Sequence, residues 1–260
     1  AENSTVTLSG YGGSITMGNQ GIALYSKDSA LSSGTLNVNY TNTAKGVGIY
    51  YEGTNSVMNN ITVNHTGDNL VSIFADGISL TNTAAQTIND DGIGVYGDNG
   101  AVVSNQGTLT LNGDDTIGIY LDGAASQITN IGTIAGTPST VGNKIGVYVN
   151  SGDITGNTAY NFDIDGGIGI YLKNNDISYT GTMTVAGDSN SVNRTIGIYV
   201  DPSITGTLGT NINITGENAI GIYLAENSGV AANITYNGEL NITSASTADR
   251  GIGALLEQGS

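Results

Sequence analysis

Several residue types are absent or rare in this sequence, and each absence excludes a class of structure or chemistry. Its 260 residues include no cysteine and no tryptophan, two prolines and one histidine. Without cysteine there is no disulfide, no thiol nucleophile and no thiolate metal site. The single histidine, His65, stands in a polar Asn-His-Thr segment, which predicts a solvated side chain rather than a catalytic base. No apolar run is long enough for a membrane-spanning helix.

Basic residues are also scarce. Six Lys and Arg oppose 22 Asp and Glu, which gives a net charge of −16. Such a polyanion repels phosphate backbones, so we exclude nucleic acid as a partner. An acidic surface favours cationic partners and predicts binding that weakens as salt rises. Ala1–Gly10 has no signal-peptide pattern, and the repeat described next has no end caps, so we expect an internal piece of a longer secreted protein rather than a cytosolic one.

What the sequence does contain is a four-residue phrase that returns ten times along the chain. It reads aliphatic, small, aliphatic, aromatic, with a decayed last copy. Successive aromatic positions are 22 to 32 residues apart, and a period in the twenties with strand-forming residues predicts a stacked array. We therefore expect residues 1–260 to form one β-helical segment without separate domains. The copies are Ile22–Tyr25, Val47–Tyr50, Val71–Phe74, Ile93–Tyr96, Ile117–Tyr120, Ile145–Tyr148, Ile168–Tyr171, Ile196–Tyr199, Ile220–Tyr223 and Ile252–Leu255.

Two further short strands are expected after each phrase, such as 102–104 and 109–111. Three strands of about three to five residues plus turns fill one coil of this length. The predicted fold class is all-β, a right-handed parallel β-helix (solenoid) of about ten coils with three short strands per coil. A propeller would need repeats of about 40 residues, and a leucine-rich horseshoe would need an Asn-containing signature that is missing.

Strand alternation assigns the faces of one phrase, Thr116–Asp122. Side chains alternate along a strand, so Ile117, Ile119 and Leu121 are predicted to point inward. Thr116, Gly118, Tyr120 and Asp122 are then predicted to point outward. The same alternation puts Lys144, Thr195 and Ala219 outward and Val149, Leu172, Val200 and Leu224 inward.

The outward aromatic residues form the first candidate site. Stacked in one row, they would either stabilise strand pairing and cover nearby glycines, or offer a flat strip to sugars or a partner protein. Both interpretations stay open here. The members proposed as binding residues are Tyr96, Tyr120, Tyr148, Tyr171, Tyr199 and Tyr223.

An acidic column is expected two residues after the aromatic position. It contains Glu52, Asp76, Asp98 and Asp122. Like charges one strand apart repel, so these groups must be solvated, protonated or bridged by a cation such as Ca²⁺. They also initiate turns, since Gly or Asn-Gly follows three of them. We predict no metal site and no cofactor.

Long loops before the phrase form the second candidate site. The three longest intervals gain residues at 136–143, 187–194 and 244–250, and solenoid insertions often collect on a binding side. Lys144, Arg194 and Arg250 lie at this corner, either as a basic rim that binds a partner or as ordinary charges of solvated loops. Asp163 and Asp165, with Arg194 one coil away, could serve polysaccharide cleavage, but nothing marks them as a cluster. We predict no catalytic residue.

The repeated GIGIYL, TIGIYL and TIGIYV phrases, with second strands such as the one at 128–134, resemble a known group. They are similar to the passenger domains of type V autotransporters, most closely the large fusobacterial outer-membrane autotransporter adhesins. The resemblance implies a passenger that is continuous with an outer-membrane β-barrel and displayed on the bacterial cell surface. It implies a non-enzymatic adhesin that attaches to protein or glycan receptors on host cells or other bacteria. A polysaccharide-degrading β-helix enzyme and a toxin-type passenger are the alternatives.

Overall fold

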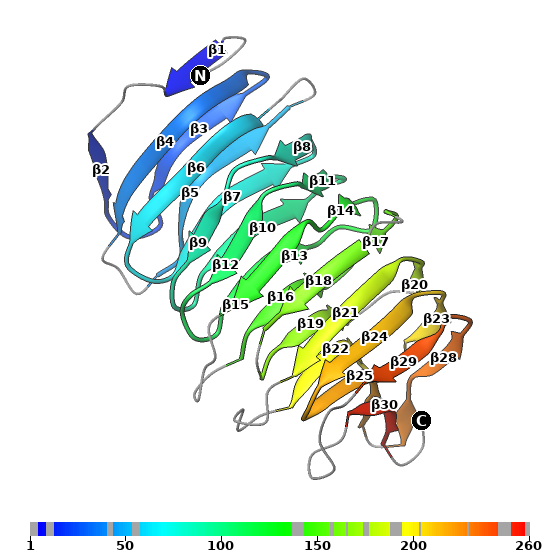
Figure 1. Ribbon diagram of the computed structural model, residues 1–260. Helices are drawn as coiled ribbons and strands as arrows, with labels where there is room; N and C mark the ends of the chain where they lie inside the picture. The colour runs from blue at the N-terminus through cyan, green and yellow to red at the C-terminus, as the bar shows by residue number, and fades with distance from the viewer. Residues whose placement is uncertain are drawn as a thin grey trace.

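The computed structural model describes twelve stretches of the chain. Within them the protein is all-β, and its parallel strands form a β-solenoid of about eight turns (Figure 1). This confirms the predicted parallel solenoid, whereas the right-handed coil, the count of ten coils and the three strands of each coil stay predictions. No helix in these stretches is long and apolar enough to cross a bilayer. The stretches are 5–8, 13–40, 44–53, 58–136, 143–156, 159–164, 166–173, 177–187, 194–202, 204–227, 229–243 and 251–257.

The repeated phrase forms the largest sheet. Ten strands lie side by side in sequence order, and all pair in parallel. This order is what a solenoid requires, because consecutive turns stack directly on one another. The strands are β3 (Ile22–Lys27), β5 (Gly46–Glu52), β7 (Leu70–Asp76), β10 (Ile93–Asp98), β13 (Ile117–Leu121), β16 (Ile145–Val149), β19 (Ile168–Leu172), β22 (Thr195–Val200), β25 (Ala219–Leu224) and β30 (Ile252–Leu256).

Three smaller parallel sheets form the other sides of the solenoid from β8 onward. The seven-stranded sheet contains β9 (Gln86–Ile88), β12 (Thr108–Leu111), β15 (Thr133–Gly136), β18 (Ala159–Asp163), β21 (Thr182–Gly187), β24 (Asn211–Gly216) and β29 (Leu240–Thr243). The four-stranded sheet contains β8 (Ser79–Asn82), β11 (Val102–Asn105), β14 (Gln127–Asn130) and β17 (Asp153–Ile154). The three-stranded sheet contains β20 (Ile177–Tyr179), β23 (Thr205–Leu208) and β28 (Asn233–Tyr236).

The first turns depart from three short strands. Their remaining sides are built from β4 (Ala30–Tyr40) and β6 (Met58–Thr66), which pair in parallel, while β1 (Thr5–Leu8) and β2 (Ser14–Met17) pair with β4. β4 continues for 11 residues because alternate side chains, including Leu36, Val38 and Tyr40, stay buried. One antiparallel hairpin, β26 (Glu226–Asn227) with β27 (Val230–Ala231), interrupts the otherwise parallel pattern.

His65 corrects a prediction. The side chain was expected in solvent, but it continues the buried face of β6 after Ile61 and Val63 and is 7% exposed. Its Nδ1 lies 3.1 Å from the carbonyl oxygen of Gly67, and burial lowers the pKa of the imidazole. His65 is therefore a neutral core residue at neutral pH. Its polar neighbour Asn64 gave no sign of this, because Asn64 is exposed on the alternate face of the strand.

The interior is mainly aliphatic with some buried aromatic residues, and buried asparagines lie at one corner. Asn82 donates to Asn105 at 2.7 Å, and the amide of Asn105 donates to the backbone oxygen of Ile131 at 2.7 Å. Both amides are buried, and they satisfy turn backbone that would otherwise lack partners. Tyr51 is also fully buried and donates to the Ser29 carbonyl oxygen at 2.6 Å. Stacked apolar residues and corner amides therefore fill the bore together.

The glycine of the repeated phrase lies on the inner face, and this corrects the predicted alternation. Ile119 and Leu121 are fully buried as expected, but Gly118 is buried beside Ile134, whereas Ile117 is half-buried. Strand pairing skips the glycine, joining Ile117 to Ile145 and then Ile119 to Val147. Alternation therefore breaks here, and the residues expected outward just before the phrase are buried instead. They are Thr116, Lys144, Thr195 and Ala219.

A close backbone approach explains the glycine column. A Cβ built on Gly118 would lie 2.6 Å from the carbonyl oxygen of Gly146, one turn away. The same 2.6 Å recurs from Gly94 to Gly118 and from Gly197 to Gly221. At these glycines a side chain would press on the next turn, although two copies of the phrase carry the small residues Ala23 and Ser72 at the same position. The tyrosine two positions later is left facing outward.

Candidate functional site

The outward tyrosines form one continuous aromatic ladder on the ten-stranded sheet. Nine rings from Tyr25 to Tyr223 stack in sequence, with neighbouring ring centroids 4.6 to 5.9 Å apart. Ring planes differ by as little as 5° for Tyr50 and Phe74. This confirms the predicted outward row. Since each inner ring is covered on both faces by its neighbours, the ladder presents ring edges and phenol oxygens to solvent.

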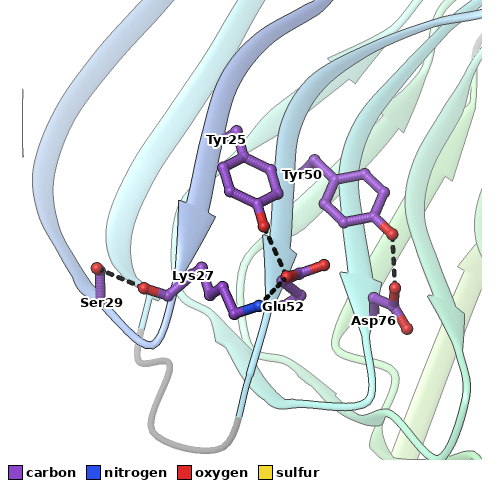
Figure 2. Close-up of polar contacts among 6 residues, drawn as sticks. All are labelled: Tyr25, Lys27, Ser29, Tyr50, Glu52 and Asp76. Atoms are coloured by element: carbon purple, nitrogen blue, oxygen red, sulfur yellow. Dashed lines mark hydrogen bonds and ion pairs between the residues drawn. The ribbon is translucent and has the colours of Figure 1, made fainter. Parts of the chain in front are cut away.

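Carboxylates are joined to this ladder with an offset of one turn. Figure 2 shows Tyr25 donating to Glu52 Oε1 at 2.6 Å and Tyr50 donating to Asp76 Oδ2 at 2.5 Å. Tyr171 donates to Asp201 Oδ1 at 3.2 Å in the same way. Each acceptor stands two residues after the aromatic of the following turn, so the repeat places phenol and carboxylate together. The contact strengthens both columns, because a hydrogen bond to an ionised acceptor is stronger than a neutral one.

The acidic column is stabilised by hydrogen-bond donors. Lys27 Nζ lies 3.1 Å from Glu52 Oε1, and the hydrogen bond from Tyr25, followed by that from Lys27, lowers the pKa of Glu52 (Figure 2). The amide of Asn99 donates to Asp76 Oδ1 at 2.7 Å. These hydrogen-bond donors offset the repulsion between neighbouring carboxylates that the sequence led us to expect. Among the described residues no group of three or more Asp, Glu or His could hold a metal ion.

Asp122 shows how strongly one column member can be held. Ser151 Oγ donates to its Oδ1 at 2.7 Å, Asn150 Nδ2 at 3.1 Å and the backbone of Gly123 at 2.8 Å. Burial alone would raise the pKa of this carboxyl, but the hydrogen bonds outweigh it and the pKa is lowered. Asp122 therefore stays ionised and starts its turn, as the sequence suggested.

The phenols respond in the opposite direction. Burial, followed by the charge of Tyr148 and then of Asp122, raises the pKa of Tyr120 to about 12. The hydrogen bond to Glu257 raises the pKa of Tyr223 to about 12. Burial is also the leading cause for Tyr96 and Tyr171, whose pKa values are raised beyond the usual range. These four phenols therefore keep their protons at neutral pH.

Some turns lack the carboxylate that a phenol would meet. The residue in the acceptor position is Asn150 for Tyr120, Lys173 for Tyr148 and Ala225 for Tyr199. The ammonium of Lys173 lies 6.0 Å from the centroid of the Tyr148 ring. The residues two positions after each aromatic form what we call the polar column. These substitutions divide it into an acidic part near the first turns and a mixed part near the last ones.

The basic residues predicted at the loop corner differ in their exposure to solvent. Lys144 is 2% exposed and its Nζ donates to the Leu111 carbonyl oxygen at 3.0 Å, so it is a structural cation rather than part of an exposed rim. Arg194 is exposed. Arg250 and nearly all of the three long loops lie outside the described residues, as do Asp165 and the Asp163 side chain.

Sequence reasoning missed a groove beside the ladder. Its cavity of about 540 Å³ lies between the end of the Tyr ladder and the hairpin β26–β27, and its lining includes Lys173, Tyr199, Asp201 and Glu226. Extra residues of the longest interval were placed just before the last phrase, but the hairpin puts some of them directly after β25. The loss of a polar residue at Ala225 was the signal that could have pointed to this place.

Comparison with known proteins gives no relatives. No family model matches the chain, and neither a curated protein nor a solved structure matches it.

Proposed function

We propose that the chain is a non-enzymatic adhesin segment displayed on a bacterial cell surface as part of an autotransporter passenger. The observation that carries the proposal is the aromatic ladder with its attached polar column, which repeats one surface pattern over nine rings of an elongated solenoid. Aromatic and charged side chains in such a row suit recognition, because they combine apolar edges with hydrogen-bonding groups. The sequence resemblance to autotransporter adhesins supports the same function.

Attachment through a ladder of this kind is multivalent. Turns of a parallel solenoid are about 4.8 Å apart, so a receptor meets an aromatic ring edge at every step and a carboxylate at many of them. Weak contacts add up when they are held on one stiff body, so a host-cell or bacterial receptor needs no deep pocket. The proposal includes a right-handed coil of ten turns with three strands per turn, because this geometry determines how rigidly the surface residues are held.

Cell binding by the isolated chain tests the proposal. Labelled protein is presented to epithelial cells and to bacterial cells, beside the double variant Tyr120→Ala, Tyr148→Ala. We expect the variant to bind about tenfold more weakly, which corresponds to about 1.4 kcal/mol, and binding of the parent chain to fall as salt rises. Thr108→Ala with Thr133→Ala, on the seven-stranded sheet, is the matched control that should bind normally. A folded double variant that binds as well as the parent contradicts the proposal.

A further inference from the structure

One side of the solenoid lacks a strand ladder between the first turns and the later ones. Within the part of the chain that the structure describes, β6 pairs only with β4, although β9 lies against β6 on its other side (Figure 1). The ten-stranded sheet, in contrast, runs through this region without a break, because β5 pairs with β7 and β7 with β10. The backbone pairing that joins successive turns on that sheet is therefore missing where β6 meets β9.

Side-chain amides take the place of the missing ladder. The buried Gln86 amide accepts from the Val63 backbone N–H at 2.7 Å and donates to the Ile61 carbonyl oxygen at 2.8 Å. One residue beyond β9, the amide of Asn89 donates to the His65 carbonyl oxygen at 3.2 Å. Ile61, Val63 and His65 are alternate residues of β6, so two side chains hold the strand along its length. We call these five residues the amide joint.

His65 places the one imidazole of the chain inside this joint. Its Nδ1 lies 3.1 Å from the Gly67 carbonyl oxygen, and a carbonyl only accepts, so Nδ1 carries the hydrogen and Nε2 keeps a lone pair. Nε2 is buried and has no hydrogen-bond partner among the described residues. The neutral ring suits this place, whereas a protonated ring would bring a charge and a second N–H into it.

The surroundings of the ring oppose its charged form. Burial is the first cause that lowers the pKa of His65. The backbone groups of Gly67 and Thr87 and the charge of Asp68 raise this pKa, but by less than burial lowers it. Asp68 follows β6 and is itself exposed, so water weakens its attraction for a charged ring.

Other titratable groups on the neighbouring elements are exposed or already bonded. On β4, Tyr40 donates to the backbone oxygen of Ala44. At the end of β7, Asp76 accepts a hydrogen bond from the aromatic ladder. Asp90 and Asp91, in the turn after β9, are exposed. Neither β8 nor β9 contains a titratable residue, so Asp68 is the charge that acts on the ring.

We infer that the amide joint is an acid-sensitive switch: when His65 gains a proton, the contact between β6 and β9 opens while the ten-stranded sheet stays paired. A charged ring is better solvated outside the bore, and its departure disturbs the Gly67 carbonyl oxygen, which Asn89 also contacts at 3.4 Å. Since the chain has one histidine, no other side chain has its usual pKa between pH 5 and 8.

The lowered pKa fixes the direction of the response. The open joint takes up a proton at the usual histidine pKa of about 6.5, whereas the closed joint binds it more weakly. The stability of the closed joint is therefore complete above about pH 6.5 and is lost as the pH falls through the lowered pKa of the buried ring.

Hydrogen exchange of the full chain, followed by NMR from about pH 7.5 to about pH 5, tests the switch. The Val63 amide reports on the joint, and the Ile145 amide, which donates to the Thr116 carbonyl oxygen at 2.9 Å, is the reference on the ten-stranded sheet. After correction for the intrinsic effect of pH on exchange, we expect Val63 protection to fall about fivefold or more and Ile145 protection to change less than about twofold. The single imidazole signal should titrate below about pH 6.5, over the range in which Val63 loses protection.

Three variants separate the imidazole from other effects of acid. His65→Leu removes the proton and keeps an apolar side chain on the buried face, so Val63 protection should no longer depend on pH. His65→Leu with Asn64→His moves the imidazole to the exposed face of β6 and should not restore the dependence. Asp68→Asn removes the charge that favours protonation, so it should shift both midpoints to lower pH.

Four results overturn the inference. These are an imidazole that titrates at or above about pH 6.5, Val63 protection that stays constant while the imidazole titrates, a pH response that persists in His65→Leu, and an equal loss at Ile145, which means that the whole solenoid opens. If His65→Leu fails to fold, the surface variant Asp68→Asn decides, because unchanged midpoints contradict the switch. Cell binding by the chain has no part in any of these measurements, so the switch and the adhesin function fail separately.

Discussion

The two faces of the ten-stranded sheet follow different rules. On the inner face a glycine column approaches the next turn so closely that a Cβ would lie 2.6 Å from its carbonyl oxygen. On the outer face the aromatic ladder repeats just as regularly, but the polar column beside it changes from Glu52 to Asn150 to Ala225. The inner face fixes the spacing of the turns, whereas the outer face is free to vary. The polar column next to the ladder therefore varies more in its chemistry than the glycine column does.

The largest effect should come from filling the inner face. In Gly146→Ala the new methyl group meets the Phe162 ring and lies 2.6 Å from the Gly169 carbonyl oxygen. We expect the free energy of unfolding to fall by about 3 kcal/mol, as overpacking of a filled core does. Gly253→Ala is the control, because its nearest contacts are at 3.5 Å, and it should cost less than about 1 kcal/mol. Denaturant unfolding followed by circular dichroism measures both, and equal losses would contradict the comparison.

A smaller effect should come from raising the pH, which acts on the outer face. Burial is the first cause that raises the pKa of Tyr120 from 10.0 to about 12. A raised pKa in the folded state means that the unfolded chain releases its phenol protons first as pH rises. The stabilising contribution is therefore complete below about pH 10 and lost as the pH approaches about 12. We expect the thermal unfolding midpoint to fall across this pH window while the absorbance of phenolate rises. A midpoint that stays constant would contradict the prediction.

The smallest effect should separate two phenols of one ladder. Tyr50→Phe removes a donor to Asp76, whereas Tyr199→Phe removes a phenol for which the next turn has Ala225 in the acceptor position. We expect Tyr50→Phe to lower the free energy of unfolding by up to about 1 kcal/mol and Tyr199→Phe to change it by less than about 0.3 kcal/mol. The two variants keep the ring stack, so the difference between them reports the carboxylate contact. Identical denaturation curves for the two variants would remove that contact from the account of stability.

Much of the fold could be predicted because the repeat is long and its apolar residues are regular. Ile119, Tyr120 and Leu121 have the faces that simple alternation assigns them. The alternation rule was wrong at Gly118. The break in alternation recurs from turn to turn, so it leaves the repeat period unchanged and gives no signal in the sequence. Lys144 was misplaced for the same reason, because it lies on the far side of that break.

The residues of the candidate site could be predicted from the sequence, but the hydrogen bonds between them could not. The outward row of tyrosines followed from spacing, and the acids two residues later were recognised as a column. The link between Tyr25 and Glu52 crosses turns, and it could have been found by aligning each phrase with the next. The groove depends on the path of a short hairpin, which no periodic pattern encodes.

The hydrogen bonds between turns run along the solenoid axis, and this determines how the protein responds to tension. A pull on the chain ends meets the ladders one turn at a time, as a zipper opens, instead of shearing a whole sheet at once. Each turn that opens replaces a spacing of about 4.8 Å with up to about 80 Å of extended chain. Under tension such a solenoid would therefore lengthen in steps of one turn.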